Sequence, residues 1–263
     1  MSSALLLYPL IGAVAGILAG LLGVGGGVVI VPVLIFAFHW QGISENVLTH
    51  MAIGTSLATI LMTSLGSIRQ HHRAHAVRWS VAGTLSIGLV IGAVMGAWFA
   101  DSLKGRVIQI LFAIFALFVA AKMLFGSKPQ ASRQLPSISG MVGAGGVIGF
   151  ASAIFGIGGG SLTVPFLVWC NLRMQEAVGT SAACGFPIAL AGASAFVWTG
   201  WMAADLPPYS FGYLYLPALV GIAITSVPFA QVGARMAHRL PAATLKKVFA
   251  VLLVAASLKL LIG

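Results

Sequence analysis

Two glycine-rich stretches decide the fold of this chain: GLLGVGGGVVIVP at residues 20–32 and AIFGIGGGSLTVP at residues 153–165. Both lie inside long apolar segments, where each glycine costs a helix about 0.5–1 kcal/mol relative to alanine. In both stretches three consecutive glycines are followed, after four further residues, by a proline, Pro32 or Pro165. We therefore expect each stretch to interrupt a helix, with the two prolines as structural parts of the break.

The composition is that of an integral membrane protein. Hydrophobic residues make up 59% of the 263 residues and charged residues only 7%. The mean hydropathy is +1.05, and apolar runs long enough to span a bilayer recur along the chain. The net charge of +10 does not indicate a nucleic-acid partner, because basic residues that flank apolar runs are explained by orientation in a lipid bilayer. The sequence therefore predicts an all-α polytopic membrane protein.

The chain contains an internal sequence repeat. An Ala-x-Gly-Thr-Ser element occurs at 52–56 and again at 177–181, an offset of 125, and the glycine runs repeat at an offset of 133. A third set of matches, such as Gly96 with Gly233, has an offset of 137. The order is kept and the offset drifts only slightly, as a short insertion or deletion in a loop would cause. We divide the chain into a first transmembrane repeat, a cytoplasmic linker and a second transmembrane repeat, at residues 1–126, 127–137 and 138–263.

Each repeat holds five apolar segments, and the second of them is too short to span a bilayer as a helix. About 11 helical residues rise about 17 Å, against about 30 Å of hydrocarbon, and an extended glycine run adds about 16 Å. The expected helices cover about 4–22, 28–39, 47–68, 80–100, 106–125, 138–156, 161–170, 177–200, 211–234 and 243–262.

The basic residues decide whether the short segments cross. With eight spans, seven basic residues lie on each side of the membrane, whereas ten crossings place eleven on one side and three on the other. The positive-inside rule favours ten crossings, which makes the two repeats inverted. The loops at 69–78 and 235–247 are then cytoplasmic, and the loop at 201–208 faces the outside.

Inverted repeats with discontinuous helices are typical of secondary transporters. The chain has no G-x-x-x-x-G-K-[ST] motif for ATP, so a gradient or a separate partner must drive transport. An anion channel is the alternative from another class. A membrane enzyme would need a nucleophile–base pair or a metal cluster at one depth. The sequence shows no such group, and we expect no catalytic residue, no metal and no cofactor.

The predicted site contains neutral hydrogen-bond donors. Helices restart after each glycine run, and the N–H groups at a helix N-terminus attract anions. Hydroxyls fall nearby in the third segment of each repeat, and no Asp or Glu lies in mid-segment, which suits a small oxyanion. The alternative is structural, with glycines that permit close packing and hydroxyls bonded to their own helix. The expected substrate-binding residues are Gly25, Gly26, Gly27, Thr55, Ser56, Gly158, Gly159, Gly160, Ser161, Thr180 and Ser181.

The histidines and cysteines lie outside this set, and each has a structural interpretation beside a functional one. His50 lies about one turn before the first Gly-Thr-Ser element and could couple transport to protons. An interfacial histidine explains it as well, and sodium is the other coupling ion considered. The HHRAH tract within 69–78 resembles a metal-binding tract, but its arginines favour a solvated loop. Cys170 and Cys184 form neither a disulfide framework nor a zinc pattern.

The pair GVGGGVVIVP and GIGGGSLTVP, each followed by A-x-G-T-S, resembles the TauE/SafE family of membrane permeases over essentially the whole chain. The resemblance implies a secondary transporter in the inner, cytoplasmic membrane of a prokaryote. It also implies a small sulfur-containing or organic anion as substrate, such as sulfite, thiosulfate or sulfoacetate. Members of the family act as exporters or in uptake and are often drawn with eight spans, whereas the charge count here favours ten.

Overall fold

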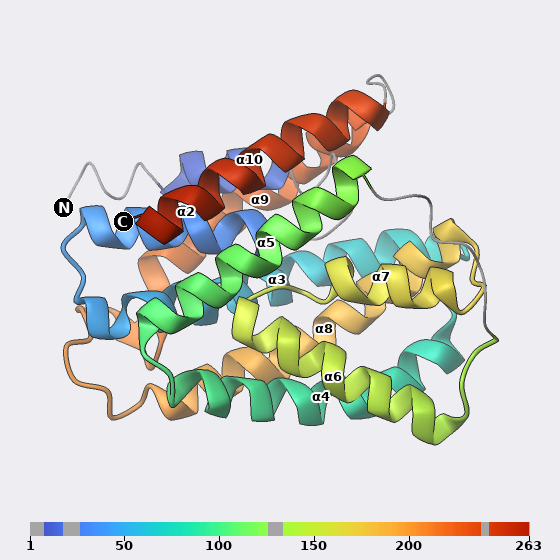
Figure 1. Ribbon diagram of the computed structural model, residues 1–263, viewed down its shortest axis with the longest axis horizontal. Coiled ribbons are helices and arrows are strands. Elements are labelled where there is room, and N and C mark those ends of the chain that lie inside the picture. Colours follow the sequence, from blue (N-terminus) through green and yellow to red (C-terminus); the bar gives the residue numbers. More distant parts are fainter. Residues whose placement is uncertain (1–7, 18–26, 126–133, 238–241, 263) are drawn as a thin grey trace.

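The computed structural model describes residues 8–17, 27–125, 134–237 and 242–262, and most of them are helical (Figure 1). Within these residues, five helices are long and apolar enough to cross a membrane, namely α3, α4, α5, α6 and α8. The expected all-α polytopic fold is thereby confirmed. The helices are Tyr8–Ile17, α2 Gly27–Trp40, α3 Glu45–Arg73, α4 Trp79–Asp101, α5 Gly105–Phe125, α6 Ile138–Phe155, α7 Gly160–Trp169, α8 Met174–Thr199, α9 Leu216–Ala237 and α10 Ala242–Ile262.

Two boundaries differ from the expectation. α3 continues to Arg73, so the predicted loop at 69–78 shrinks to 74–78; basic side chains in a last helical turn are stabilised by the helix dipole. In the second repeat a hairpin of β1 (Ser210–Phe211) and β2 (Leu214–Tyr215) occupies the place where the next span was expected to begin. α9 starts after it at Leu216, with a proline as its second residue, a position that proline tolerates because first-turn N–H groups have no helical acceptor.

The two prolines do not form the breaks, so that expectation was wrong. Pro32 lies inside α2 and Pro165 inside α7, each as the sixth residue of its helix. A proline there leaves the carbonyl four residues earlier without its N–H partner but does not end the helix. α2 has 14 residues and α7 has 10, rises of about 21 Å and 15 Å. The short helices are therefore as the sequence indicates, and in the second repeat the interruption lies in the glycines before α7.

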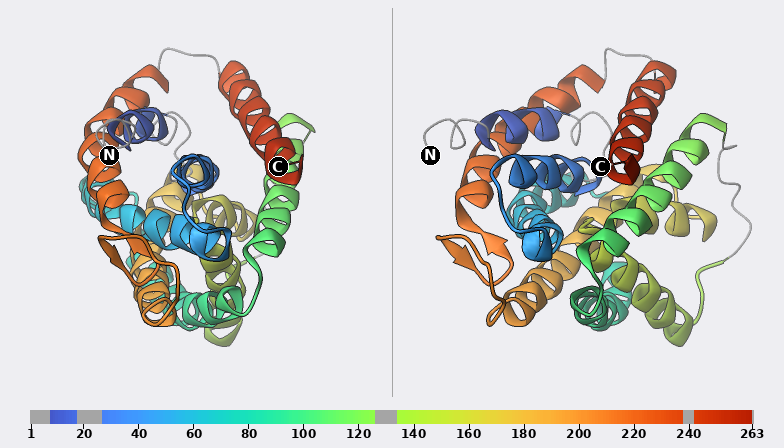
Figure 2. Two further views of the ribbon diagram at one scale, coloured as in Figure 1. Left: turned by 90° about the vertical axis from the view of Figure 1, so that its left-hand side faces the viewer. Right: turned by 60° about the vertical axis from the view of Figure 1, so that its left-hand side comes forward.

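The centre of the molecule is formed by α2 and the first half of α3. Seen end-on, α2 lies near the middle of the bundle, with α9 on one side and α5 and α10 on the other (Figure 2). Every residue of α3 from Val47 to Ile60 is buried, and α2 buries nine of its fourteen residues. The first and second repeats are therefore not two separate bundles placed side by side.

Glycine stripes hold the first helix of each repeat against the fourth helix of the other. Gly88, Gly92 and Gly96 of α4 recur at a spacing of four and lie against the backbone of α6. The helix Tyr8–Ile17 packs on α9 in the same way, with Gly16 against the carbonyl of Ser226. Small residues at this spacing let helix backbones approach closely within a membrane. The stripes therefore join the two repeats at two places.

These two contacts are equivalent under the offsets seen in the sequence. Gly149 of α6 lies against the carbonyl of Leu89, and Gly16 lies against that of Ser226. Gly16 and Gly149 are 133 residues apart, and Leu89 and Ser226 are 137 apart. The internal repeat found in the sequence thus recurs as a repeat of contacts.

Candidate functional site

The second glycine run forms a four-residue break between α6 and α7. Gly156 has φ +63° and Gly159 has φ +75°, in the left-handed region that glycine enters without steric cost. The end of α6 is closed by the Ile157 N–H, which donates to the Ser152 carbonyl over 2.9 Å. The N–H groups of Gly160 and Ser161 open α7 and have no acceptor within that helix. The break therefore ends in a helix N-terminus with free donors.

The N-terminus of α2 lies against the same break. Gly25 and Gly26 of the first run lie outside the described residues, and Gly27 is the first residue of α2. A Cβ atom on Gly27 would lie 2.5 Å from the Gly156 carbonyl oxygen and 2.9 Å from the Ile157 Cα. The N-terminus of α7 and the first described residue of α2 consequently lie on either side of one short piece of non-helical backbone.

Buried hydroxyls without partners surround the start of α7. Within the described part of the chain, the hydroxyls of Ser152, Ser161 and Thr163 have no hydrogen-bond partner. Ser152 and Thr163 are completely buried. A Cβ atom on Gly159 would lie 3.2 Å from Thr163 Oγ1 and 3.7 Å from Ser152 Oγ, so these two hydroxyls flank the residue that precedes α7. Ser152, Ser161 and Thr163 are called the hydroxyl cluster below.

One stripe of α8 closes the break from the other side. Ile188 Cδ1 lies 2.5 Å from the Cβ position of Gly159, and a Cβ atom on Gly185 would lie 3.1 Å from the Gly158 carbonyl oxygen. Ser181 is one helical turn before Gly185 on the same face, and its hydroxyl also has no partner among the described residues. Its counterpart in the first repeat, Ser56, does have a partner, the Gly156 carbonyl in the break of the second repeat. Because the matching break residue for Ser181 lies outside the described ranges, we leave Ser181 out of the cluster.

The hydroxyl cluster exists in only one of the two repeats. At the offset of 133, the residues that match Ser161 and Thr163 are Val28 and Ile30, and Ser152 matches Ala19. Sequence reasoning named Ser161 but missed Ser152 and Thr163. The available signal was a hydroxyl residue in an apolar segment whose counterpart in the other repeat is apolar.

The two Gly-Thr-Ser elements bind the opposite repeat. Thr55 Oγ1 accepts a hydrogen bond of 3.0 Å from the N–H of Tyr215, directly before α9. Thr180 Oγ1 accepts one of the same length from the N–H of Arg78, directly before α4. The two threonines are 125 residues apart and the two donors 137 apart, so the caps are equivalent. We call them the reciprocal caps, since each repeat supplies the N-terminal cap of a helix in the other.

The residues beside these threonines have structural contacts too. A Cβ atom on Gly54 would lie 2.8 Å from the Tyr213 carbonyl oxygen, and one on Gly179 would lie 2.5 Å from that of Ala76. Ser56 donates to the Gly156 carbonyl over 2.8 Å and so holds the second break. For Thr55, Ser56 and Thr180 these partners favour the structural alternative over direct contact with a substrate.

Thr55→Val and Thr180→Val are expected to lower the stability of the protein by about the same amount. Each leaves a helix N–H without its acceptor, which costs about 1–2 kcal/mol. Thermal unfolding of the purified protein in detergent measures the loss, with Thr84→Val as the control because the Thr84 hydroxyl bonds only to the Ser80 carbonyl of its own helix. Loss of substrate binding in either cap variant at unchanged stability would assign the threonines to the substrate instead.

His50 is buried near the start of α3 and is not in contact with the break. Its side chain is 3% exposed, its Nε2 lies 3.0 Å from the Ala100 carbonyl oxygen, and its ring stacks on Tyr213 at 5.1 Å between centroids. Burial, with a smaller effect from the charge of Asp101, raises the pKa of the Tyr213 hydroxyl to about 12. Tyr213 therefore stays neutral beside His50 at physiological pH. In the HHRAH tract, His72 accepts from the Trp79 indole, and the described residues contain no cluster that could hold a metal.

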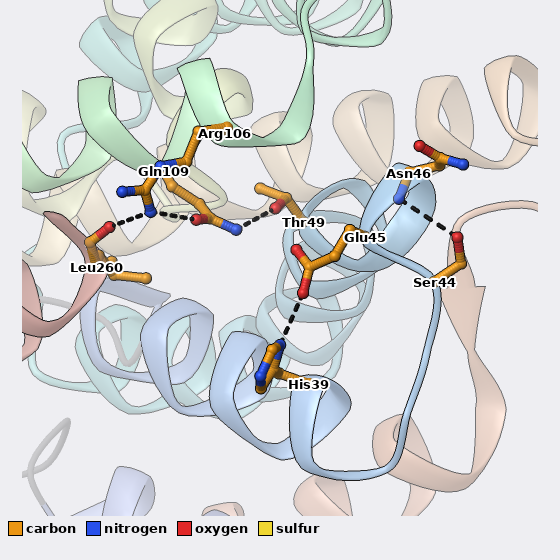
Figure 3. A network of polar contacts seen from close by, with 8 residues as sticks. All are labelled: His39, Ser44, Glu45, Asn46, Thr49, Arg106, Gln109 and Leu260. Atoms are coloured by element: carbon orange, nitrogen blue, oxygen red, sulfur yellow. Dashed lines mark hydrogen bonds and ion pairs between the residues drawn. The ribbon is translucent and has the colours of Figure 1, made fainter. Parts of the chain in front are cut away.

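The ion pairs in the described chain lie at helix ends. At the start of α8, Glu176 Oε1 lies 3.0 Å from Arg78 Nη2 and 2.8 Å from Arg173 Nη2. At the opposite end of the bundle, Arg106 at the start of α5 donates to the carbonyl oxygens of Leu260 and Leu261 in α10. Arg106 also donates to Gln109, which in turn donates to Thr49 of α3 (Figure 3). His39 Nδ1 lies 2.7 Å from Glu45 Oε1 in the same region (Figure 3). The break and the hydroxyl cluster thus lie between two ends of the helix bundle that carry charged side chains.

Comparison with known proteins agrees with this architecture. The family model described as sulfite exporter TauE/SafE matches residues 8–260. A probable membrane transporter protein of Haemophilus influenzae is 37% identical over 99% of both chains. One from Methanocaldococcus jannaschii is 28% identical over 90% of this chain and 88% of its own. With its apolar helices and interrupted segments, this multi-pass membrane protein belongs to the TauE/SafE family of membrane transporters.

Proposed function

We propose that the protein is a secondary transporter that moves a small sulfur-containing or organic anion, such as sulfite, thiosulfate or sulfoacetate, across the cytoplasmic membrane of a prokaryote. The observation that carries the proposal is a pair of completely buried hydroxyls beside the N-terminus of α7, those of Ser152 and Thr163, which have no partner among the described residues. A buried hydroxyl without a partner costs about 1–3 kcal/mol, which a bound oxyanion would offset. The family description as a sulfite exporter supports the substrate class.

Alternating access is supported by the directions of the central helices. A Cβ atom on Gly54 of α3 would lie 3.2 Å from Phe196 Cβ of α8, and one on Gly192 of α8 would lie 2.9 Å from Leu57 Cδ1 of α3. Positions that advance along α3 thus meet positions that move back along α8. α3 and α8 therefore run antiparallel, as equivalent helices of inverted repeats must. Two parallel repeats of eight spans would make them run in the same direction.

The proposed topology predicts opposite accessibility of two exposed loops. Met202 is 91% exposed in the loop after α8, and His75 is exposed in the 74–78 loop. In a background without Cys170 and Cys184, an impermeant maleimide should label Met202→Cys in intact cells and His75→Cys only after the membrane is opened. Labelling of both positions from the same side would contradict the inverted arrangement.

Transport itself is tested with purified protein in proteoliposomes loaded with sulfite. A carrier should show saturable flux and counterflow, in which unlabelled sulfite on one side accelerates exchange of labelled sulfite from the other. An anion channel should show flux without counterflow. The matched control is Gly159→Ala protein, whose added Cβ atom enters the proposed site. Equal counterflow by both proteins would place the substrate elsewhere, and its absence from the unaltered protein would favour the channel.

A further inference from the structure

We propose that the anion site selects substrates that carry a single negative charge. This inference rests on the proposed function, because it concerns the same break between α6 and α7. It adds a property that the fold and the family do not specify, namely the charge of the transported form. Of the anions considered above, it favours the singly charged form of sulfite over the dianions thiosulfate and sulfoacetate, and it also disfavours sulfate.

The segments that form the break and the facing part of α8 contain no acidic or basic side chain. Residues 138–172 supply α6, the break and α7, and residues 177–199 supply the facing part of α8; neither segment contains Asp, Glu, Lys, Arg or His. Residues 8–38, which include the start of α2, contain none either. On α3, residues 46–68 contain only His50, whose Nε2 lies against the Ala100 carbonyl. These segments therefore offer dipoles and hydroxyls, and the Lys259 ammonium of α10 lies over the Phe36 ring of α2, nine residues along that helix from Gly27.

The available positive potential matches one negative charge. A helix N-terminus acts as about half a positive charge; that of α7 follows the break, and Gly27, the first described residue of α2, lies against Gly156. The positive potential at the break thus comes from partial charges, which favours one negative charge over two. The cost of removing an ion from water rises with the square of its charge, so a dianion costs about four times as much to bury as a monoanion. Charged donors such as arginine form the stronger hydrogen bonds to anions, and this site has hydroxyl donors instead.

Three arginines in the described part of the chain are engaged elsewhere. Arg78 and Arg173 bond to Glu176 at the start of α8, and Arg106 bonds to the carbonyl oxygens of Leu260 and Leu261. These guanidinium groups lie at helix ends and serve ion pairs and helix C-termini. A substrate that passes them to reach the break leaves the charged surroundings behind, which penalises a second charge on the substrate.

The test compares anions of similar size and different charge. Binding to the full-length protein in lipid nanodiscs is measured by calorimetry at constant ionic strength, with sulfite, methanesulfonate, sulfate and thiosulfate as the probes. We expect methanesulfonate to compete with sulfite at least about tenfold better than sulfate or thiosulfate does. Competition by either dianion as strong as that of methanesulfonate would overturn the inference while leaving an anion site in place. Failure of all four anions to bind would overturn the proposed function itself.

The pH dependence gives an independent readout. The second proton of sulfite dissociates near neutral pH, whereas methanesulfonate carries one charge throughout. Between about pH 6 and about pH 8, the apparent affinity for total sulfite should fall as the singly charged form disappears. The affinity for methanesulfonate should stay constant, which controls for any change in the protein over this pH range. A constant sulfite affinity over this range would contradict selection for the monoanion.

Discussion

Thr163→Val is expected to weaken anion binding by about 10- to 100-fold while leaving the fold at least as stable. A hydrogen bond to a charged group contributes about 1.5–3 kcal/mol, so the loss of the Thr163 hydroxyl removes that much from the bound state. In the free protein the same hydroxyl is completely buried and has no partner among the described residues. Valine has nearly the same shape and removes an unsatisfied polar group, so stability should stay constant or rise.

The matched control is Thr59→Val. Thr59 is also completely buried, but its hydroxyl donates to the Thr55 carbonyl of its own helix over 2.9 Å. This variant should lose a little stability and bind the anion normally. Calorimetric binding of sulfite together with thermal unfolding separates the two effects. If Thr163→Val binds sulfite as tightly as the unaltered protein, the hydroxyl cluster is not the site.

Gly159→Ala is expected to abolish binding and to destabilise the protein. The left-handed conformation of Gly159 costs any other residue about 1–2 kcal/mol, and overpacking typically adds about 1–3 kcal/mol. The added Cβ atom would lie 2.5 Å from Ile188 Cδ1 and between the hydroxyls of Thr163 and Ser152. Thermal unfolding and sulfite binding by the same preparation measure both consequences.

A second substitution separates the steric effect on the fold from the effect on the site. Ile188→Val removes the Cδ1 atom that clashes, so Gly159→Ala with Ile188→Val should regain part of the stability but still not bind sulfite. Gly143→Ala is the control, since a Cβ atom on Gly143 would have nothing within 4 Å, and it should behave as the unaltered protein. Recovery of binding in the double variant would show that Gly159 matters only for packing.

The sequence predicts the order and the limits of the helices closely because membrane helices are specified by local composition. The short second segment, the glycine break before it and the internal repeat all follow from patterns within one stretch of chain. The roles of Thr55 and Thr180 do not, because their partners are 160 and 102 residues away. A signal for them exists: the residues directly before α4 and α9, Arg78 and Tyr215, cannot cap a helix with their side chains.

The candidate site was located less completely than the fold. The sequence predicts a site beside neutral donors in an apolar setting, and it treats the two repeats as equal contributors. Whether a hydroxyl in a membrane helix bonds to its own backbone or stays free depends on side-chain direction and neighbours, which composition does not reveal. Thr59 and Thr163 illustrate this, since both are buried threonines in apolar helices and only the first has a partner.

The reciprocal caps also impose an order on the assembly of the protein during synthesis. Thr55, which caps α9, is synthesised 160 residues before its donor Tyr215. Thr180, which caps α4, is synthesised 102 residues after its donor Arg78. At about 5–20 residues per second, the ribosome takes about 5–20 seconds to supply the cap of α4. During that interval α4 begins with a polar group that has no partner, and the second half of the chain then docks onto the first and completes it.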